Sequence, residues 1–250
     1  MKKTLHALAI IIVLLALWHA ASALRWVNPL FLPTPVEVAE TLWTQVFVTG
    51  EILPDVFATL WRFLSGYAIA VVLGITLGVL MGYSRRIYSM FEFLVDFFRS
   101  IPATALFPLF LLFFGIGDEA KIAVVVWSAT LIILVNTMYG VRHGSKLRLL
   151  VAQTMKTGRW MLFRKVIIPD ALPHIFAGLR IALSLGLIVV IVTEMFIGTT
   201  VGLGRRIIDA QLVYRVPEMY AAIILTGILG YVLNRLFLWY ERRTIHWSGR

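Results

Sequence analysis

Long apolar runs alternate with short polar segments along this chain. The apolar runs cover residues 5–24, 56–83, 101–114, 122–139, 175–197 and 219–240. An α-helix rises ~1.5 Å per residue, so about 20 apolar residues cross the hydrocarbon core of a bilayer. The pattern therefore predicts an all-α membrane protein with six transmembrane helices.

The first run has two interpretations. Lys2 and Lys3 precede it, and the sequence Ala21-Ser22-Ala23 resembles the cleavage site of a signal peptide. However, the run is longer than the ~7–15 apolar residues of a usual signal-peptide core, and it suffices to cross a bilayer. We therefore predict a first transmembrane span that is retained.

The segments between the runs carry turn and interface signals. Prolines at 29, 33 and 35 favour extended chain, and residues 36–48 are predicted to form an interfacial helix. Residues 85–99 form a short amphipathic connection, and residues 198–217 an external loop. Within the third run, Pro108 is expected to kink the helix.

Small residues recur at every fourth position along the second run. They are Gly66, Ala70, Gly74, Gly78 and Gly82. Residues four apart share one face of a helix, and a face with almost no side chains lets another membrane helix approach closely. We predict a helix-packing surface here and infer from it that the protein works as a dimer. The pattern leaves open whether the surface meets a second copy or a helix of the same chain.

Composition and charge place the chain in a membrane. The sequence is 60% hydrophobic and 14% charged, and its mean hydropathy is +0.88. The net charge of +10 is unevenly distributed, because fifteen of the 23 Lys and Arg residues fall in segments on the side of the N-terminus. This bias predicts that both termini are cytoplasmic, and it excludes nucleic acid as the expected partner. The chain has no Cys, so it has neither disulfides nor a thiolate metal site.

The longest polar interval of the C-terminal half runs from Val141 to Pro173. It holds seven Lys and Arg residues and a single carboxylate, Asp170. Apolar positions recur at helical spacing before and after Gly158, which predicts two short amphipathic helices. Pro173 and Pro169 are expected to end the second helix. The segment is either a loop that fixes topology and rests on lipid headgroups, or a docking element for a soluble partner.

This segment resembles the cytoplasmic "EAA" loop of ABC-importer permeases. In that motif Glu-Ala-Ala is followed by Gly and, thirteen residues after the Gly, by Pro. With Pro169 as that proline, the motif positions are Leu150, Val151, Ala152 and Lys156, and Gly158 lies two residues late. Only Ala152 and Pro169 match the short motif. The continuation from Arg159 to Pro173 resembles the nitrate/sulfonate/taurine-type permease subfamily more closely.

Shorter matches to the same subfamily follow in order along the chain. They include Pro33-Thr34-Pro35, Thr59-Leu60-Trp61-Arg62, Arg99-Ser100-Ile101-Pro102, Gly115-Ile116-Gly117, Gly178-Leu179-Arg180, Glu194-Met195 and Gly202-Leu203-Gly204. The resemblance implies a type I ABC importer-like permease fold, with residues 1–250 as a single transmembrane domain. Residues 1–55 would hold the first span and an external segment, and residues 56–240 the core permease with its coupling loop at 141–173.

The resemblance also implies partners and a location. The subunit would sit in a bacterial inner membrane among lipids, pair with a second copy, and receive a small anionic or sulfonate/nitrate-like solute from an extracytoplasmic solute-binding protein. A separate ABC ATP-binding subunit would hold ATP and Mg²⁺ and grip the coupling loop. The coupling residues implied are Leu150, Val151, Ala152, Thr154, Met155, Lys156, Gly158 and Pro169.

The chain itself is expected to hold no cofactor and to catalyse no reaction. Its histidines (His6, His19, His143, His174 and His246) show no metal-ligand spacing, and no Walker-type phosphate loop is present. We therefore expect ATP hydrolysis on the partner subunit.

Several polar residues inside the runs are candidates for the translocation path. Glu194 lines the path or its gate, or it is an interfacial carboxylate bonded to Thr193, Thr199 or Thr200. Asn136 contacts solute or bonds across helices, and Asn234 more simply bonds across helices. Arg180 and Arg235 are expected to anchor their helix ends at the interface.

Two other function classes remain as alternatives. A self-contained secondary transporter should show inverted repeats with paired broken helices and ionisable residues at the midplane, and the sequence shows no such pairing. A non-transporting membrane anchor for a cytoplasmic complex would explain the basic segment but not the polar residues within the spans.

Overall fold

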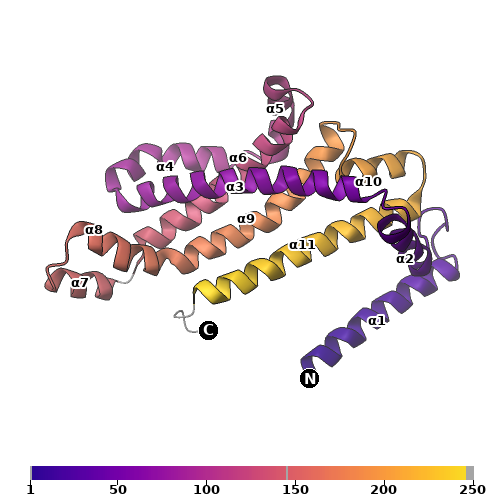
Figure 1. Cartoon of the computed structure of the whole chain (residues 1–250), viewed down its shortest axis with the longest axis horizontal. Coiled ribbons are helices and arrows are strands. Elements are labelled where there is room, and N and C mark those ends of the chain that lie inside the picture. The colour runs from indigo at the N-terminus through magenta and orange to yellow at the C-terminus, as the bar shows by residue number, and fades with distance from the viewer. Residues whose placement is uncertain (1, 145, 246–250) are drawn as a thin grey trace. The chain divides into compact units, whose positions relative to one another are not determined.

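The structure is a computed structural model that describes residues 2–144 and 146–245, and these residues form helices and connections without a strand (Figure 1). The α-helices are α1 (Lys2–Ala23), α2 (Pro35–Trp43), α3 (Leu53–Tyr83), α4 (Arg85–Arg99), α5 (Phe107–Phe114), α6 (Asp118–Arg142), α7 (Lys146–Thr154), α8 (Arg159–Leu162), α9 (Ile168–Phe196), α10 (Leu203–Leu212) and α11 (Val216–Thr244). A 3₁₀ turn covers Ala103–Leu106, and π-helical turns cover Thr44–Val48 and Phe163–Ile167.

Four helical stretches among the described residues are long and apolar enough to cross a membrane. They are Leu53–Tyr83, Asp118–Arg142, Arg159–Phe196 and Val216–Thr244, and a bent pair formed by α4 and α5 makes a fifth candidate. In α1 the apolar stretch Ala9–Ala23 falls short of this length. The chain is thus a multi-pass membrane protein.

The chain forms two compact units. The first consists of Met1–Ala58 and Thr200–Ile228, and the second of Thr59–Thr199 and Leu229–Arg250. Contact therefore groups residues 200–228 with the N-terminal segment, although they are distant in sequence. The single domain predicted for residues 1–250 stays a prediction.

In the first unit, side chains of α1 hold the segment that leads into α2. Trp18 Nε1 donates to the Pro33 carbonyl (2.9 Å), and Ser22 Oγ donates to the Leu32 carbonyl (2.8 Å). Thr34 caps α2 and forms a reciprocal pair of hydrogen bonds with Glu37, the arrangement that satisfies free N–H groups at a helix start. The helix predicted at 36–48 is present as α2 and the π-helical turn that follows it, and its interfacial position stays a prediction.

In the second unit, α3 and α9 both pack closely on α6. A Cβ atom added at Gly74 would lie 2.7 Å from the Ile133 Cβ, and one added at Gly78 would lie 2.6 Å from the Thr137 Cβ. Gly66 and Gly82 meet α6 in the same way. The surface of small residues on α3 is therefore occupied by a helix of the same chain, and it gives no support to the inference of a dimer.

The third apolar run does not form one span. Here α4 ends at Arg99, and after the 3₁₀ turn α5 runs on at 87° to it, a bend visible in Figure 1. Pro102 lacks an N–H and biases Ile101 toward extended backbone, so the helix stops before it. Pro108 then occupies the first turn of α5, where proline is tolerated, and the predicted kink at this residue is wrong.

One further expectation about a helix end is wrong. Pro169 and Pro173 do not end the second helix of the basic segment, because helix continues from Arg159 to Phe196. The π-helical turn before Pro169 supplies the reason: Ile168 N–H bonds the carbonyl of Phe163, five residues earlier, and this wider turn leaves room for the ring. The predicted external loop at 198–217 contains a short helix, α10, and its external position stays a prediction.

Candidate functional site

A cluster of charged and hydroxyl side chains, buried at its centre and partly exposed at Asp118, lies where α3, α6 and the end of α9 meet in the second unit. We call it the Arg62 cluster: Thr59, Arg62, Asp118, Glu194 and Thr199. Arg62 Nε pairs with Asp118 Oδ1 at 2.7 Å, and its Nη1 pairs with Glu194 Oε1 at 2.6 Å. Its Nη2 donates to the Thr199 hydroxyl at 3.1 Å, and the Thr59 hydroxyl donates to both oxygens of Glu194 at 3.0 and 2.9 Å.

Local helix geometry brings these groups together. Thr59 and Arg62 are three residues apart, so they share one face of α3. Asp118 opens α6, where a carboxylate also interacts favourably with the helix N-terminus. Glu194 lies in the last turn of α9. Each side chain thus comes from a helix that crosses the membrane or from the turn at its end.

The two charged side chains at the centre of the cluster are buried. Glu194 is fully buried and Arg62 is 5% exposed. Taking both charges out of water is costly, and their mutual pairing and hydrogen bonds offset that cost. The Glu194 carboxylate is thus enclosed by protein, and whether it lies at the depth of the outer headgroups stays a prediction. Whether Glu194 also gates the path stays a prediction.

The pairing partner of Glu194 was missed by sequence reasoning, although a signal existed. Arg62 and Glu194 are both ionisable residues within apolar runs, and such residues usually pair with one another. Their separation by more than 130 residues hid the pair. Lys121 is another buried charged residue, with 1% exposure. Its ammonium group donates to the carbonyls of Ile116 (2.7 Å) and Gly117 (3.0 Å).

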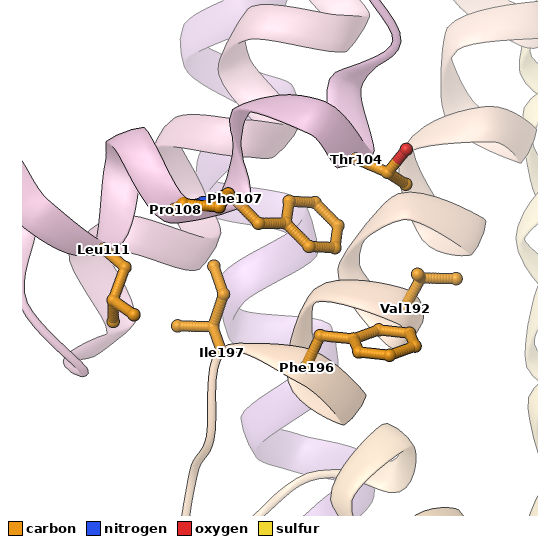
Figure 2. A pocket seen from close by; sticks show the side chains of 7 residues that line it. All are labelled: Thr104, Phe107, Pro108, Leu111, Val192, Phe196 and Ile197. Atoms are coloured by element: carbon orange, nitrogen blue, oxygen red, sulfur yellow. The ribbon is translucent and has the colours of Figure 1, made fainter.

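An apolar pocket of about 390 Å³ lies between the α5 region and the end of α9 (Figure 2). Figure 2 shows Phe107 from α5 and Ile197 and Phe196 from the end of α9 around the same space. The Thr104 hydroxyl is the one polar side-chain group among its described lining residues. Such a lining suits an apolar group and offers nothing to a charged solute.

A second pocket, of about 400 Å³, lies where α4 breaks before α5. We call it the mid-span pocket, because its α6 residues, Trp127 to Asn136, lie in the middle of that helix. Its polar lining residues are Arg99, Trp127, Ser128 and Asn136. The structure thus places the path candidate Asn136 in a pocket, where its Nδ2 donates to the Ile132 carbonyl (2.9 Å).

Arg99 is displaced from its expected position. The charge count assigned it to the segment on the cytoplasmic side, whereas it contributes to a pocket beside the middle of α6. Its guanidinium approaches Asp96 at 3.6 Å, and both side chains are more than half exposed. The two path candidates lie apart, since Asn136 lines the mid-span pocket and Glu194 belongs to the Arg62 cluster.

The basic segment exposes the apolar face predicted for coupling. Leu150, Val151 and Met155 are 58%, 52% and 74% exposed, and Thr154 is exposed beside them. Ala152 is 6% exposed and thus belongs to the interior of the chain instead. Figure 1 shows α7 and α8 together, next to the start of α9. Arg148 forms an ion pair with Asp170, so part of the positive charge of the segment is neutralised internally.

Lys156, which occupies the glycine position of the motif, lies just after the end of α7. Lys156 has a φ of 51°, the left-handed backbone that favours glycine. The Thr157 N–H bonds the Ala152 carbonyl at 3.1 Å, which makes Lys156 the left-handed residue of a helix-ending Schellman motif. Lys156, at the position of the motif glycine, thus adopts a backbone conformation that glycine favours. Gly158, two residues later, has an ordinary φ of −60°.

Comparison with known proteins identifies relatives along nearly the whole chain. A probable ABC transporter permease protein of Brucella abortus is 34% identical over 233 residues, 93% of this chain and 91% of that protein. The taurine transport system permease protein TauC of Escherichia coli is 30% identical and covers 95% of this chain and 87% of its own length. The bicarbonate transport system permease protein CmpB of Synechococcus elongatus is 33% identical, with 94% and 87% covered.

The fold agrees with this relationship. A chain of the MetNI methionine ABC transporter superposes with a TM-score of 0.66, covering 79% of this chain and 96% of that chain, at 22% sequence identity. The fold is thus that of a type I ABC importer permease. Residues 70–246 match the family described as binding-protein-dependent transport system inner membrane component. The chain belongs to this family, and it is the membrane-spanning permease subunit of an ABC importer, a transport component and not an enzyme.

Proposed function

We propose that this permease moves a small anion, of the sulfonate or bicarbonate type, that an extracytoplasmic binding protein delivers. The names of the relatives support this solute class: one is a taurine permease protein and another a bicarbonate permease protein. Taurine carries a sulfonate group, so both solutes present a compact group of oxygens with negative charge. The mid-span pocket is consistent with this class, since it holds an arginine.

Energy would come from a separate ATP-binding subunit that holds ATP and Mg²⁺ and docks on the face formed by Leu150, Val151, Thr154 and Met155. The exposure of this apolar face carries the proposal. Apolar side chains that are exposed together beside basic residues are typical of a surface that a partner covers. The side of the membrane with this face, and with both termini, would be the cytoplasm.

A single continuous helix supports a mechanical link between docking and the membrane. Helix runs from Arg159, next to the docking face, to Phe196, beside the Arg62 cluster. A displacement at the α8 end would therefore reach Glu194 along one continuous helix. In this mechanism ATP binding draws the coupling segments together and opens the path toward the binding protein, and hydrolysis resets it.

A second copy of the chain would complete the path. Because α6 already covers the small-residue surface of α3, the contact between copies would use other apolar side chains. Candidates lie on α4 and α5, where Phe93, Leu112 and Phe113 are 75%, 80% and 71% exposed. Lipid would cover the parts of this surface that the second copy leaves open.

Uptake into proteoliposomes tests the proposed function. Reconstituted permease with its ATP-binding subunit and loaded binding protein should accumulate a small anion only when ATP is supplied to the docking-face side. Uptake without the ATP-binding subunit would indicate a secondary transporter instead. Normal binding of that subunit without any uptake would indicate a membrane anchor.

A further inference from the structure

The break between α4 and α5 lies at the level of the middle of α6. At one end of α4, the Arg142 guanidinium lies 3.7 Å from the centre of the Tyr88 ring. Near the other end, the rings of Phe98 and Trp127 are 5.1 Å apart. Helix α4 therefore rises from the Arg142 end of α6 to its middle and stops there, one residue beyond Phe98.

Two features of this break are costly inside a bilayer. The backbone from Ser100 to Pro102 is not helical, so some of its polar groups need partners outside a helix. The Arg99 side chain is 55% exposed, and a charge at this depth is tolerated where it faces a cavity that admits water. Irregular backbone and an exposed arginine at one level both indicate a hydrated cavity rather than lipid.

The lining of the mid-span pocket determines which charge it would accept. Arg99 supplies a guanidinium, Ser128 a hydroxyl and Asn136 an amide. The Trp127 indole N–H is buried and has no acceptor in the described part of the chain. None of the described residues that line the pocket carries a carboxylate. Asp96, one turn before Arg99, is exposed and reaches it only at 3.6 Å. The pocket thus favours an anion.

The other residues that line the pocket indicate which kind of anion would fit it. Ile101, Leu131, Ile132 and Val135 give the pocket an apolar wall, and its volume of about 400 Å³ exceeds what an inorganic oxyanion fills. Sites for small organic ligands combine such apolar walls with a few polar groups that fix orientation.

We propose that the mid-span pocket is a solute site for a small organic anion, such as a short-chain alkanesulfonate. Arg99 pairs with the anionic group, and the apolar wall contacts its carbon chain. This inference rests on the proposed function and specifies the solute and the residue that selects it. Arg62, by contrast, has its hydrogen-bonding groups engaged within the protein and takes no part in recognition.

Uptake of ethanesulfonate and of nitrate by the complete reconstituted transporter tests the inference. A hydrogen bond to a charged group contributes about 1.5–3 kcal/mol, so Arg99→Gln should lower ethanesulfonate uptake at least about tenfold. Arg99→Lys keeps the charge and should retain more than about a third of the uptake. Arg86→Gln, an exposed arginine at the other end of α4, is the matched control and should leave uptake unchanged.

A second variant separates recognition from folding. Ser128→Asp leaves Arg99 in place and adds a carboxylate to the pocket, so it should also lower ethanesulfonate uptake about tenfold. In both Arg99→Gln and Ser128→Asp, the ATP-binding subunit should stay associated, and stimulation of ATP hydrolysis by the loaded binding protein should persist. A purely structural role of Arg99 would reduce association and hydrolysis together with uptake, and that result would overturn the inference.

The remaining outcomes distinguish the inference from the proposed function. Wild-type uptake of nitrate without ethanesulfonate would leave the proposed small-anion function standing and refute the organic-anion site. Wild-type ethanesulfonate uptake that Arg99→Gln leaves unchanged would refute the role of Arg99 alone. Wild-type uptake of neither anion would refute the organic-anion site, and absence of bicarbonate uptake as well would refute the proposed function.

Discussion

Arg62 and Arg99 are both arginines within the membrane-spanning part of the second unit, and their surroundings differ sharply. Arg62 is 5% exposed and contacts Asp118, Glu194 and Thr199. Arg99 is more than half exposed, and its ion pair with Asp96 is long, at 3.6 Å. The same side chain thus serves to join helices in one place and is left available for a ligand in the other.

The same contrast separates larger surfaces of the molecule. The small-residue surface of α3 is filled by α6, whereas the apolar side chains on the face of α7 are more than half exposed. Mutations on surfaces that are packed against another helix of the same chain should lower stability. Surfaces that the chain leaves open should respond through association or transport, with stability unchanged.

The largest effect should come from opening the Arg62 cluster. Arg62→Met leaves Glu194 buried without its guanidinium, and breaking a buried pair from one side costs about 3–5 kcal/mol. Thermal unfolding of the detergent-purified complex should show a marked loss of stability, and Arg99→Gln should show almost none. The double variant Arg62→Met/Glu194→Gln removes the orphaned charge and should recover part of the loss. Equal stability losses for Arg62→Met and Arg99→Gln would erase the distinction between the two arginines.

Transport measurements test the Arg62 cluster independently of stability. Glu194→Gln keeps the shape of the side chain and removes its charge. If the pair must open and close during transport, uptake should fall severalfold while the ATP-binding subunit stays bound. Unchanged uptake would make the cluster a static clamp. Association is measured by co-purification and uptake in proteoliposomes.

The next effect concerns the contact between α3 and α6. Gly78→Ala would place a Cβ 2.6 Å from the Thr137 Cβ, and overpacking of this kind costs about 1–3 kcal/mol. Gly227, in α11, is the matched control, because an added Cβ there meets nothing within 4 Å. Gly227→Ala should leave the unfolding temperature unchanged or raise it slightly, since Ala favours helix. Equal tolerance at both positions would contradict the close packing of α3 on α6.

On the open face of α7, single truncations should weaken docking without affecting stability. Met155→Ala and Leu150→Ala each remove an exposed apolar side chain that a partner groove would bury, and such contacts contribute about 1–2 kcal/mol. The affinity for the ATP-binding subunit should fall about tenfold. Arg148→Glu should weaken docking less, because rim charges are screened by salt. Since Arg148 pairs with Asp170, this variant also needs the stability measurement as its control. Loss of the partner in Arg148→Glu alone would indicate an electrostatic docking surface.

The smallest effect should come from the end of α7. Lys156 holds a left-handed backbone that Gly adopts without strain, so Lys156→Gly should stabilise this turn by about 1 kcal/mol or less. Hydrogen exchange of the peptide that contains α7 should slow accordingly. Lys156→Ala removes the same charge without relieving the backbone and should not slow exchange. Slower exchange in both variants would assign the effect to charge.

Much of the fold followed from patterns within single segments. The apolar runs predicted the long helices α3, α6, α9 and α11, because hydropathy over about 20 residues depends on one segment alone. The four-residue repeat on α3 identified a packing surface for the same reason. Motif order along the chain also identified the family, which the relatives and the matched residues 70–246 confirm.

The helix ends near prolines were predicted less well, because they depend on the conformation of the neighbouring turns. Pro108 and Pro169 have the same covalent restriction, yet one follows a break and the other lies in a continuous helix. A wider, π-helical turn before Pro169 accommodates the proline ring, and no single residue in the sequence predicts that turn.

The sequence alone established which residues are polar within the membrane, and the tertiary structure decided what each of them meets. Glu194 and Arg62 pair across 132 positions, and Arg99 approaches the middle of α6 because α4 folds back beside that helix. Hydropathy and helical period are local properties, whereas burial and pairing depend on which helices pack together. The chemistry of each charge in this permease is therefore set by its neighbours in space, which the linear pattern does not contain.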